Sequence, residues 1–64
     1  MITLSDDDRR RFAAWLRQDA ASNKMLSEQA AKINMESIRK QKATEAMAEE
    51  IVARILESIE TMTL

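Results

Sequence analysis

The sequence contains no glycine, no proline, no cysteine and no histidine. A chain without glycine or proline is poorly suited to the tight hairpin turns of sheets and to Gly-rich loops. Disulfides need cysteine, and cysteine and histidine are the usual ligands of zinc, copper and haem iron. The composition therefore predicts an all-α protein that has neither a metal site nor another cofactor.

Charge of one sign and long apolar runs are also missing. Ten basic residues are balanced by eleven acidic ones, so the net charge is −1 and no overall field attracts nucleic acid or an anionic membrane. No apolar run approaches the roughly 20 residues that a membrane-spanning helix needs. We expect a cytoplasmic protein that binds neither membranes nor nucleic acid.

What remains is a chain rich in helix formers with two clear boundary signals. Ser5 followed by three aspartates is typical of a helix start, because the hydroxyl caps the free N–H groups and the carboxylates favour the positive end of the dipole. Asn34 is of the residue type that, after glycine, most readily adopts the left-handed conformation at a helix end. These signals predict one antiparallel helical-hairpin domain over residues 1–64, with helices at about 6–33 and 35–60.

Two details of this hairpin stay open. Asn23 could break the first helix and give a three-helix variant of the same fold. The C-terminal tail after residue 60 could fray, fill an oligomer core, or form a strand-like arm over a neighbouring subunit.

Charge complementarity offers a test of the hairpin. If the chain reverses at Asn34, residues whose numbers add up to about 68 lie opposite each other in the antiparallel pair. Opposite charges then meet along the whole length. The expected pairs are Arg9, Arg10 and Arg11 with Glu57 and Glu60, Arg17 with Glu49 and Glu50, Lys24 with Glu45, and Glu28 with Lys40.

One hairpin is too small to bury a sizeable core, because at 64 residues the apolar area gained roughly balances the entropy lost. The apolar residues of the second helix also span about half its circumference, more than one neighbour covers. We therefore expect a homo-oligomeric helical bundle, most simply a dimeric four-helix bundle, with higher assemblies as alternatives. The expected interface comprises Phe12, Leu16, Met47, Ile51, Val52, Ile55, Leu56, Ile59 and Met62.

Catalysis is not expected. A two-helix chain without loops offers little scope for a dry pocket, and no serine has a recognisable base. Glu49 and Glu50 are adjacent, so they point about 100° apart and do not converge. The protein is therefore predicted to act by binding, and no catalytic residue is assigned.

Three groups of residues are candidates for that binding. They are the basic run Arg9, Arg10 and Arg11 with Arg17; the single tryptophan Trp15; and Arg39, Lys40 and Lys42 around the turn. Each also has an ordinary structural interpretation. The basic run could neutralise Glu57 and Glu60, Trp15 could be a core residue, and the turn cluster could be a solvated helix face.

Four segments resemble small accessory proteins encoded by tailed phages and prophages: residues 12–16 (FAAWL), 44–48 (TEAMA), 51–53 (IVA) and 59–63 (IETMT). The resemblance implies a viral accessory protein made in the bacterial host cytoplasm, and it carries over no catalytic residue. Helical phage proteins of this size include some that counteract host defence, either by clamping a defence protein or by enclosing a cyclic-nucleotide signal. The resemblance thus implies counter-defence by sequestration, and the alternative is a structural or adaptor role in phage assembly or regulation.

Overall fold

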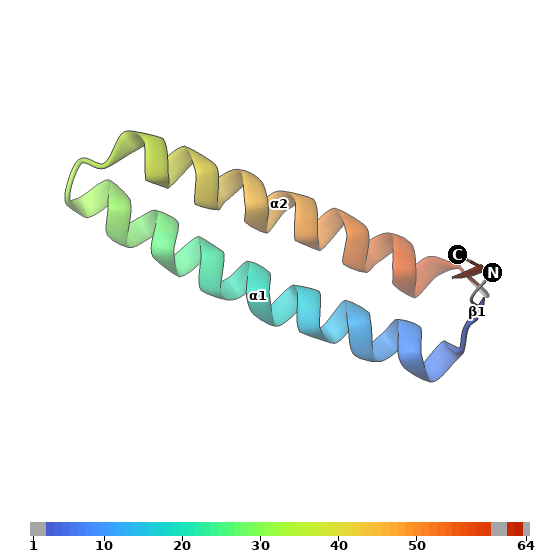
Figure 1. Cartoon of the computed structure of the whole chain (residues 1–64). Coiled ribbons are helices and arrows are strands. Elements are labelled where there is room, and N and C mark those ends of the chain that lie inside the picture. The colour runs from blue at the N-terminus through green and yellow to red at the C-terminus, as the bar shows by residue number, and fades with distance from the viewer. Residues whose placement is uncertain (1–2, 60–61, 64) are drawn as a thin grey trace.

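The computed structural model describes residues 3–59 and 62–63, and it shows a helical hairpin (Figure 1). Helix α1 spans Asp6–Lys32 and helix α2 spans Glu36–Ser58, and the two lie antiparallel along their full length. Two short strands, β1 (Thr3–Leu4) and β2 (Met62–Thr63), pair at the open end of the hairpin. The predicted hairpin of two long helices is confirmed.

Helix α1 begins as the sequence predicts and continues without a break. The Ser5 hydroxyl oxygen accepts a hydrogen bond of 3.1 Å from the Asp8 main-chain N–H, and three aspartates occupy the first turn. The possible break at Asn23 does not occur. Its side-chain amide donates to Glu49 Oε1 on α2 at 2.6 Å, so it does not compete for the main chain of its own helix.

The turn between the helices depends on Asn34, whose φ of 61° is the left-handed conformation expected for it. Two main-chain hydrogen bonds close the end of α1: Met35 N–H donates to Ala30 O at 2.9 Å, and Asn34 N–H donates to Ala31 O at 3.2 Å. Together they form a Schellman motif, which satisfies carbonyls that the end of a helix otherwise leaves free. One asparagine therefore reverses the chain without glycine.

Small side chains fill the seam between the helices. The buried positions of α1 alternate in steps of four and three, which is the seven-residue repeat of a coiled coil, and those of α2 meet them. The apolar cluster in this seam is limited to Ala13, Leu16, Ala53 and Leu56. The result is a thin rod with extents of 44 × 17 × 16 Å, in which no large side chain of the described residues is fully buried.

The ion pairs between the helices differ from those expected. Arg17 binds Glu57, with its Nε donating to Oε2 at 3.0 Å, and Lys24 binds Glu50. Side chains lean toward the start of their own helix, and in an antiparallel pair these two directions are opposite. The main-chain positions of two paired residues are therefore offset along the hairpin. As a result, the residue numbers of each pair add up to about six more than for residues that lie directly opposite each other. Opposite charges therefore meet across the hairpin at these two places, but the predicted partners of Arg17 and Lys24 are wrong. Among the described residues no ion pair joins Glu28 to Lys40, so that predicted pair is also wrong.

The C-terminal tail pairs with the start of the same chain. Strands β1 and β2 are antiparallel, with Thr3 opposite Thr63 and Leu4 opposite Met62. Within the described residues the tail is thus a short strand. The side chain of Met62 and the whole of Glu60, both named in the expectations above, lie outside the described part. No described helix is long and apolar enough to span a bilayer.

Candidate interaction surface

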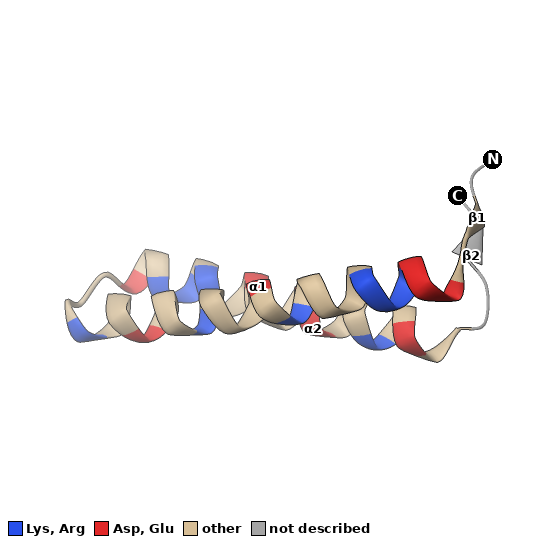
Figure 2. Ribbon diagram, turned by 90° about the horizontal axis from the view of Figure 1, so that it is seen from below, with Lys and Arg blue, Asp and Glu red and all other residues tan. Residues whose placement is uncertain are grey.

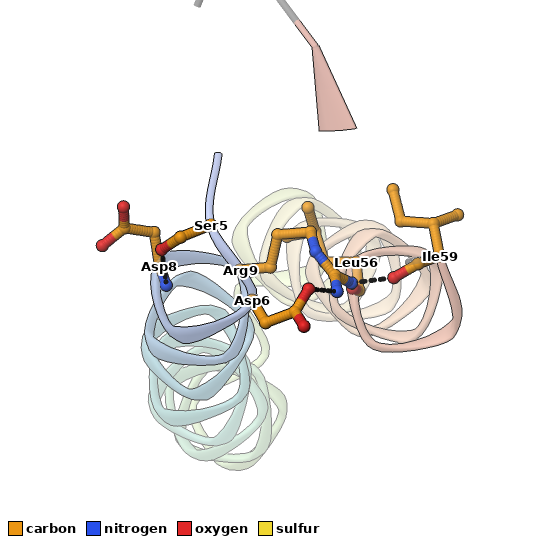
Figure 3. A network of polar contacts seen from close by, with 6 residues as sticks. All are labelled: Ser5, Asp6, Asp8, Arg9, Leu56 and Ile59. Carbon is orange, nitrogen blue, oxygen red and sulfur yellow. Dashed lines mark hydrogen bonds and ion pairs between the residues drawn. The ribbon is translucent and has the colours of Figure 1, made fainter. Parts of the chain in front are cut away.

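Arg9 joins the first turn of α1 to the last turn of α2 (Figure 3). Its side chain is buried, with the residue only 5% exposed, and Nη1 donates to the main-chain oxygens of Leu56, at 2.6 Å, and Ile59. Nη2 binds Asp6 on its own helix. Arg9 therefore holds the open end of the hairpin together and is not available to an external ligand.

The same contact explains how α2 tolerates its own charge distribution. Its last turn contains no basic residue, although cations stabilise that negative end of a helix. The guanidinium of Arg9 supplies the missing cation from the other helix, directly onto the terminal carbonyl groups. The expectation that Arg9 pairs with Glu57 is wrong, because Arg9 binds main-chain oxygens while Arg17 occupies Glu57.

Three of the other cationic candidates, Arg17, Arg39 and Lys42, form ion pairs within the chain, and Figure 2 shows both signs of charge along both helices. The hydrogen bond from Arg17 holds the pKa of Glu57 below its usual value, and that from Arg39 does the same for Glu36. Lys42 reaches Glu45 at 3.3 Å.

Three cationic candidates form no ion pair among the described residues. Lys40 acts on Glu36 and Arg10 acts on Asp6 only through space, in each case lowering the pKa of the carboxyl group. Arg11 is exposed and belongs to none of the ion pairs of the described residues. The structure therefore does not gather these cations into one anion-binding pocket.

Trp15 lies on the surface, so its interpretation as a core residue is wrong. It is 58% exposed, and its ring stands beside that of Phe12, which is 48% exposed, at a centroid distance of 6.1 Å and an angle of 55°. The reason is the seam: the seven-residue repeat places Ala13 and Leu16 inside, which leaves positions 12 and 15 on the flank. Two aromatic side chains are thus presented to solvent.

The hairpin has two different long faces. Residues two apart in a helix point about 200° apart, so Trp15 lies opposite Arg17 on α1 and Val52 lies opposite Glu50 on α2. Because Arg17 and Glu50 form ion pairs on one face, Trp15 and Val52 share the other. We call Phe12, Trp15, Val52 and Ile55 the apolar face, since Val52 and Ile55 are also 43% and 50% exposed.

The remaining interface candidates divide into two groups. Leu16 and Leu56 are buried between the two helices of the same chain, so they contribute to the hairpin core. Met47 and Ile51 are exposed, and Ile59 is half-buried. The apolar side chains available to a partner therefore include Met47 and Ile51, whereas Leu16 and Leu56 are not available.

A pair of carboxylates borders the apolar face and was missed by the sequence analysis. Asp19, one turn beyond Trp15, lies beside Glu49, and this neighbouring carboxyl group raises the pKa of Glu49 above its usual value. The signal was present in the spacing of Glu49, which falls three and four residues from the buried Ala46 and Ala53. Neither Asp19 nor Glu49 is in an ion pair with any described cation.

The charged face carries an open groove, which is lined by Lys24, Ser27, Glu28, Ala43, Met47 and Glu50. Within residues 3–59 and 62–63, no group of three or more acidic side chains is placed to hold a metal ion. The geometry of the described chain therefore supports a contact surface more than a small-molecule site.

Comparison of the chain with protein families, with characterised proteins and with solved structures finds no match. The functional conclusion accordingly depends on the geometry of the hairpin itself.

Proposed function

We propose that the protein is a non-enzymatic binding protein that works as a homo-oligomeric helical bundle and uses its apolar face as the contact surface. The observation that supports this is the exposure of Phe12, Trp15, Val52 and Ile55 together on the face opposite the ion pairs. A contiguous apolar surface of this kind marks interaction sites in soluble proteins.

The surface area of the chain supports the same proposal. Its accessible surface is 4895 Å², whereas a compact folded monomer of 7.3 kDa exposes roughly 4,200 Å². The excess is close to the roughly 800 Å² that each partner buries in an interface of standard size. One hairpin therefore exposes about the additional area that a stable dimer buries.

The shape of the chain agrees with this comparison. The Cα radius of gyration is 14.3 Å, while a compact chain of 64 residues has one of about 11 Å. A second hairpin laid against the apolar face would restore the thickness of an ordinary four-helix bundle.

The resemblance to phage accessory proteins narrows this proposal to counter-defence by sequestration. Of the two targets considered, a defence protein is favoured over a cyclic nucleotide. Trp15 and Arg17 lie on opposite faces, and Arg9 is occupied by α2, so aromatic and cationic groups do not converge on one anion. A structural or adaptor role of the same oligomer in phage assembly or regulation is the alternative.

The test is the mass of the native particle, measured by native mass spectrometry over a range of protein concentrations. Wild type should be a multimer, and Ile55→Asp should shift it to monomer because a carboxylate is costly to bury in an apolar contact. Met25→Asp is the matched control, since Met25 lies between the buried Asn23 and Ser27 and points away from the other helix. A monomeric wild type, or an Ile55→Asp variant of unchanged mass, contradicts the proposal.

A further inference from the structure

We propose that a second copy docks on α1 antiparallel and two-fold, centred on Trp15, so that Arg11 of each copy binds the Asp19–Glu49 carboxylate pair of the other. This arrangement rests on the homo-oligomer proposed above and specifies its geometry. It assigns a binding role to three charged residues that have no ion-pair partner within the described part of one chain.

Arg11, Trp15 and Asp19 follow one another at intervals of four residues, so they form a single stripe along α1. With a rise of 1.5 Å per residue, Arg11 and Asp19 lie about 6 Å on either side of Trp15 along the helix axis. A two-fold axis through Trp15 therefore brings Arg11 of one copy to the level of Asp19 of the other.

The charges on the two copies are complementary in this arrangement. Asp19 and Glu49 lie together, and the one hydrogen-bond donor found for Glu49 among the described residues is the neutral amide of Asn23. Arg11 is exposed and belongs to no ion pair of the described residues. The docked copy supplies a guanidinium to each carboxylate pair and a carboxylate pair to each guanidinium, so both sets of charges are satisfied at once.

The same charges select the direction of docking. A parallel dimer would place Asp19 against Asp19 and Glu49 against Glu49, which is repulsive. The antiparallel dimer separates these groups and stacks the apolar faces about the axis. It also brings Leu26, which is exposed, to the level of the half-buried Leu4 of the other copy, and so extends the apolar contact.

The experiment is a charge exchange between two variants. Variant one is Arg11→Glu; variant two is Asp19→Arg together with Glu49→Gln, in which the glutamine can still accept from Asn23. Each variant alone should dimerise at least about tenfold more weakly than wild type, because an attractive pair becomes a repulsive one. Mixed together, they should form the mixed dimer in excess of the half expected from random exchange, because opposite charges then meet again.

Native mass spectrometry resolves the three dimers, since the two variants differ in mass. Arg10→Glu is the matched control: it makes the same charge change at an exposed arginine about 100° around the helix from the stripe, and it should dimerise like wild type. Variants that dimerise like wild type and mix at random overturn the docking geometry while leaving the homo-oligomer intact. A wild-type chain that is monomeric throughout overturns the homo-oligomer itself.

Discussion

Arg9 donates a hydrogen bond of 2.6 Å to the main-chain oxygen of Leu56, a residue 47 positions later in the sequence. Together with the contacts to Ile59 and Asp6, this bond fastens the first turn of one helix to the last turn of the other. Because Leu56 lies in the last turn of α2, its carbonyl is one of those that a helix leaves without an intrahelical partner.

Replacing this arginine should destabilise the hairpin. We expect Arg9→Met to lower the free energy of unfolding by about 2 kcal/mol, since it keeps the apolar stem but leaves buried carbonyl oxygens unpaired. Arg9→Lys keeps the charge but has one compact donor group, so its free energy of unfolding should lie between those of wild type and Arg9→Met. Urea unfolding followed by circular dichroism, at one fixed protein concentration, measures both; equal midpoints for wild type and Arg9→Met would refute the role given to Arg9.

The turn should respond to substitution at Asn34 according to its positive φ. Asn34→Gly should be neutral or stabilising by up to about 1 kcal/mol, because glycine adopts this conformation at no steric cost. Asn34→Ala should cost about 1 kcal/mol, since a Cβ atom without a compensating polar group disfavours the left-handed region. Thermal unfolding ranks the three proteins, and an alanine variant more stable than the glycine variant would contradict the Schellman turn.

Stability should depend on pH in opposite directions at two glutamates. Folding raises the pKa of Glu49, so the folded state holds the proton of this carboxyl group more tightly than the unfolded state does. The ionised Glu49 therefore increasingly opposes folding as the pH rises above the ordinary glutamate pKa of about 4.3. In the single hairpin, at protein concentrations too low for dimers, Glu49→Gln should therefore gain stability relative to wild type above that pH and match it at more acidic pH. Arg17 lowers the pKa of Glu57, so Glu57 stabilises the fold above its ordinary pKa and loses this effect as pH falls through the lowered value.

The matched variant Glu57→Gln should accordingly lose stability at neutral pH and approach wild type in acid. Denaturant unfolding of wild type and both variants between about pH 3 and pH 7 gives the two differences directly. A loss of stability in Glu49→Gln like that expected for Glu57→Gln would mean that the Asp19–Glu49 contact is not repulsive.

The single tryptophan should report association. Trp15 is exposed in one hairpin and would be covered in the oligomer, so its fluorescence maximum should shift to shorter wavelength as protein concentration rises. Ile55→Asp should keep the long-wavelength maximum at every concentration, and Met25→Asp should behave like wild type. An emission maximum of the wild type that is independent of concentration, although its mass increases, would place the contact away from the apolar face.

The elements that the sequence predicts correctly are those that depend on one residue and its immediate neighbours. Ser5 caps α1 and Asn34 reverses the chain, because a hydroxyl beside free N–H groups and an amide in the left-handed region act locally. The hairpin follows from these two signals and from the abundance of helix formers.

The candidate surface depended instead on contacts that residue types alone do not identify. Arg9 binds main-chain oxygens, which have no side-chain signature, so charge complementarity predicted Glu57 and Glu60 as its partners. The sequence left Trp15 open between a core residue and a binding residue, because its type fits both. The seam contains alanines such as Ala13 and Ala53 and leaves Trp15 outside. A seven-residue repeat of small residues was the available signal.

Pairing of β1 with β2 also determines how the hairpin would respond to force. The two strands bring both ends of the described chain to the same end of the rod (Figure 1). Tension applied through those ends would act across the contacts, so it would separate the strands, then Arg9 from α2, and then the seam one turn at a time. When the two ends are pulled apart, the contacts of such a rod are therefore loaded one after another. When one helix is pulled parallel to the other, the contacts share the load, and the rod resists it better.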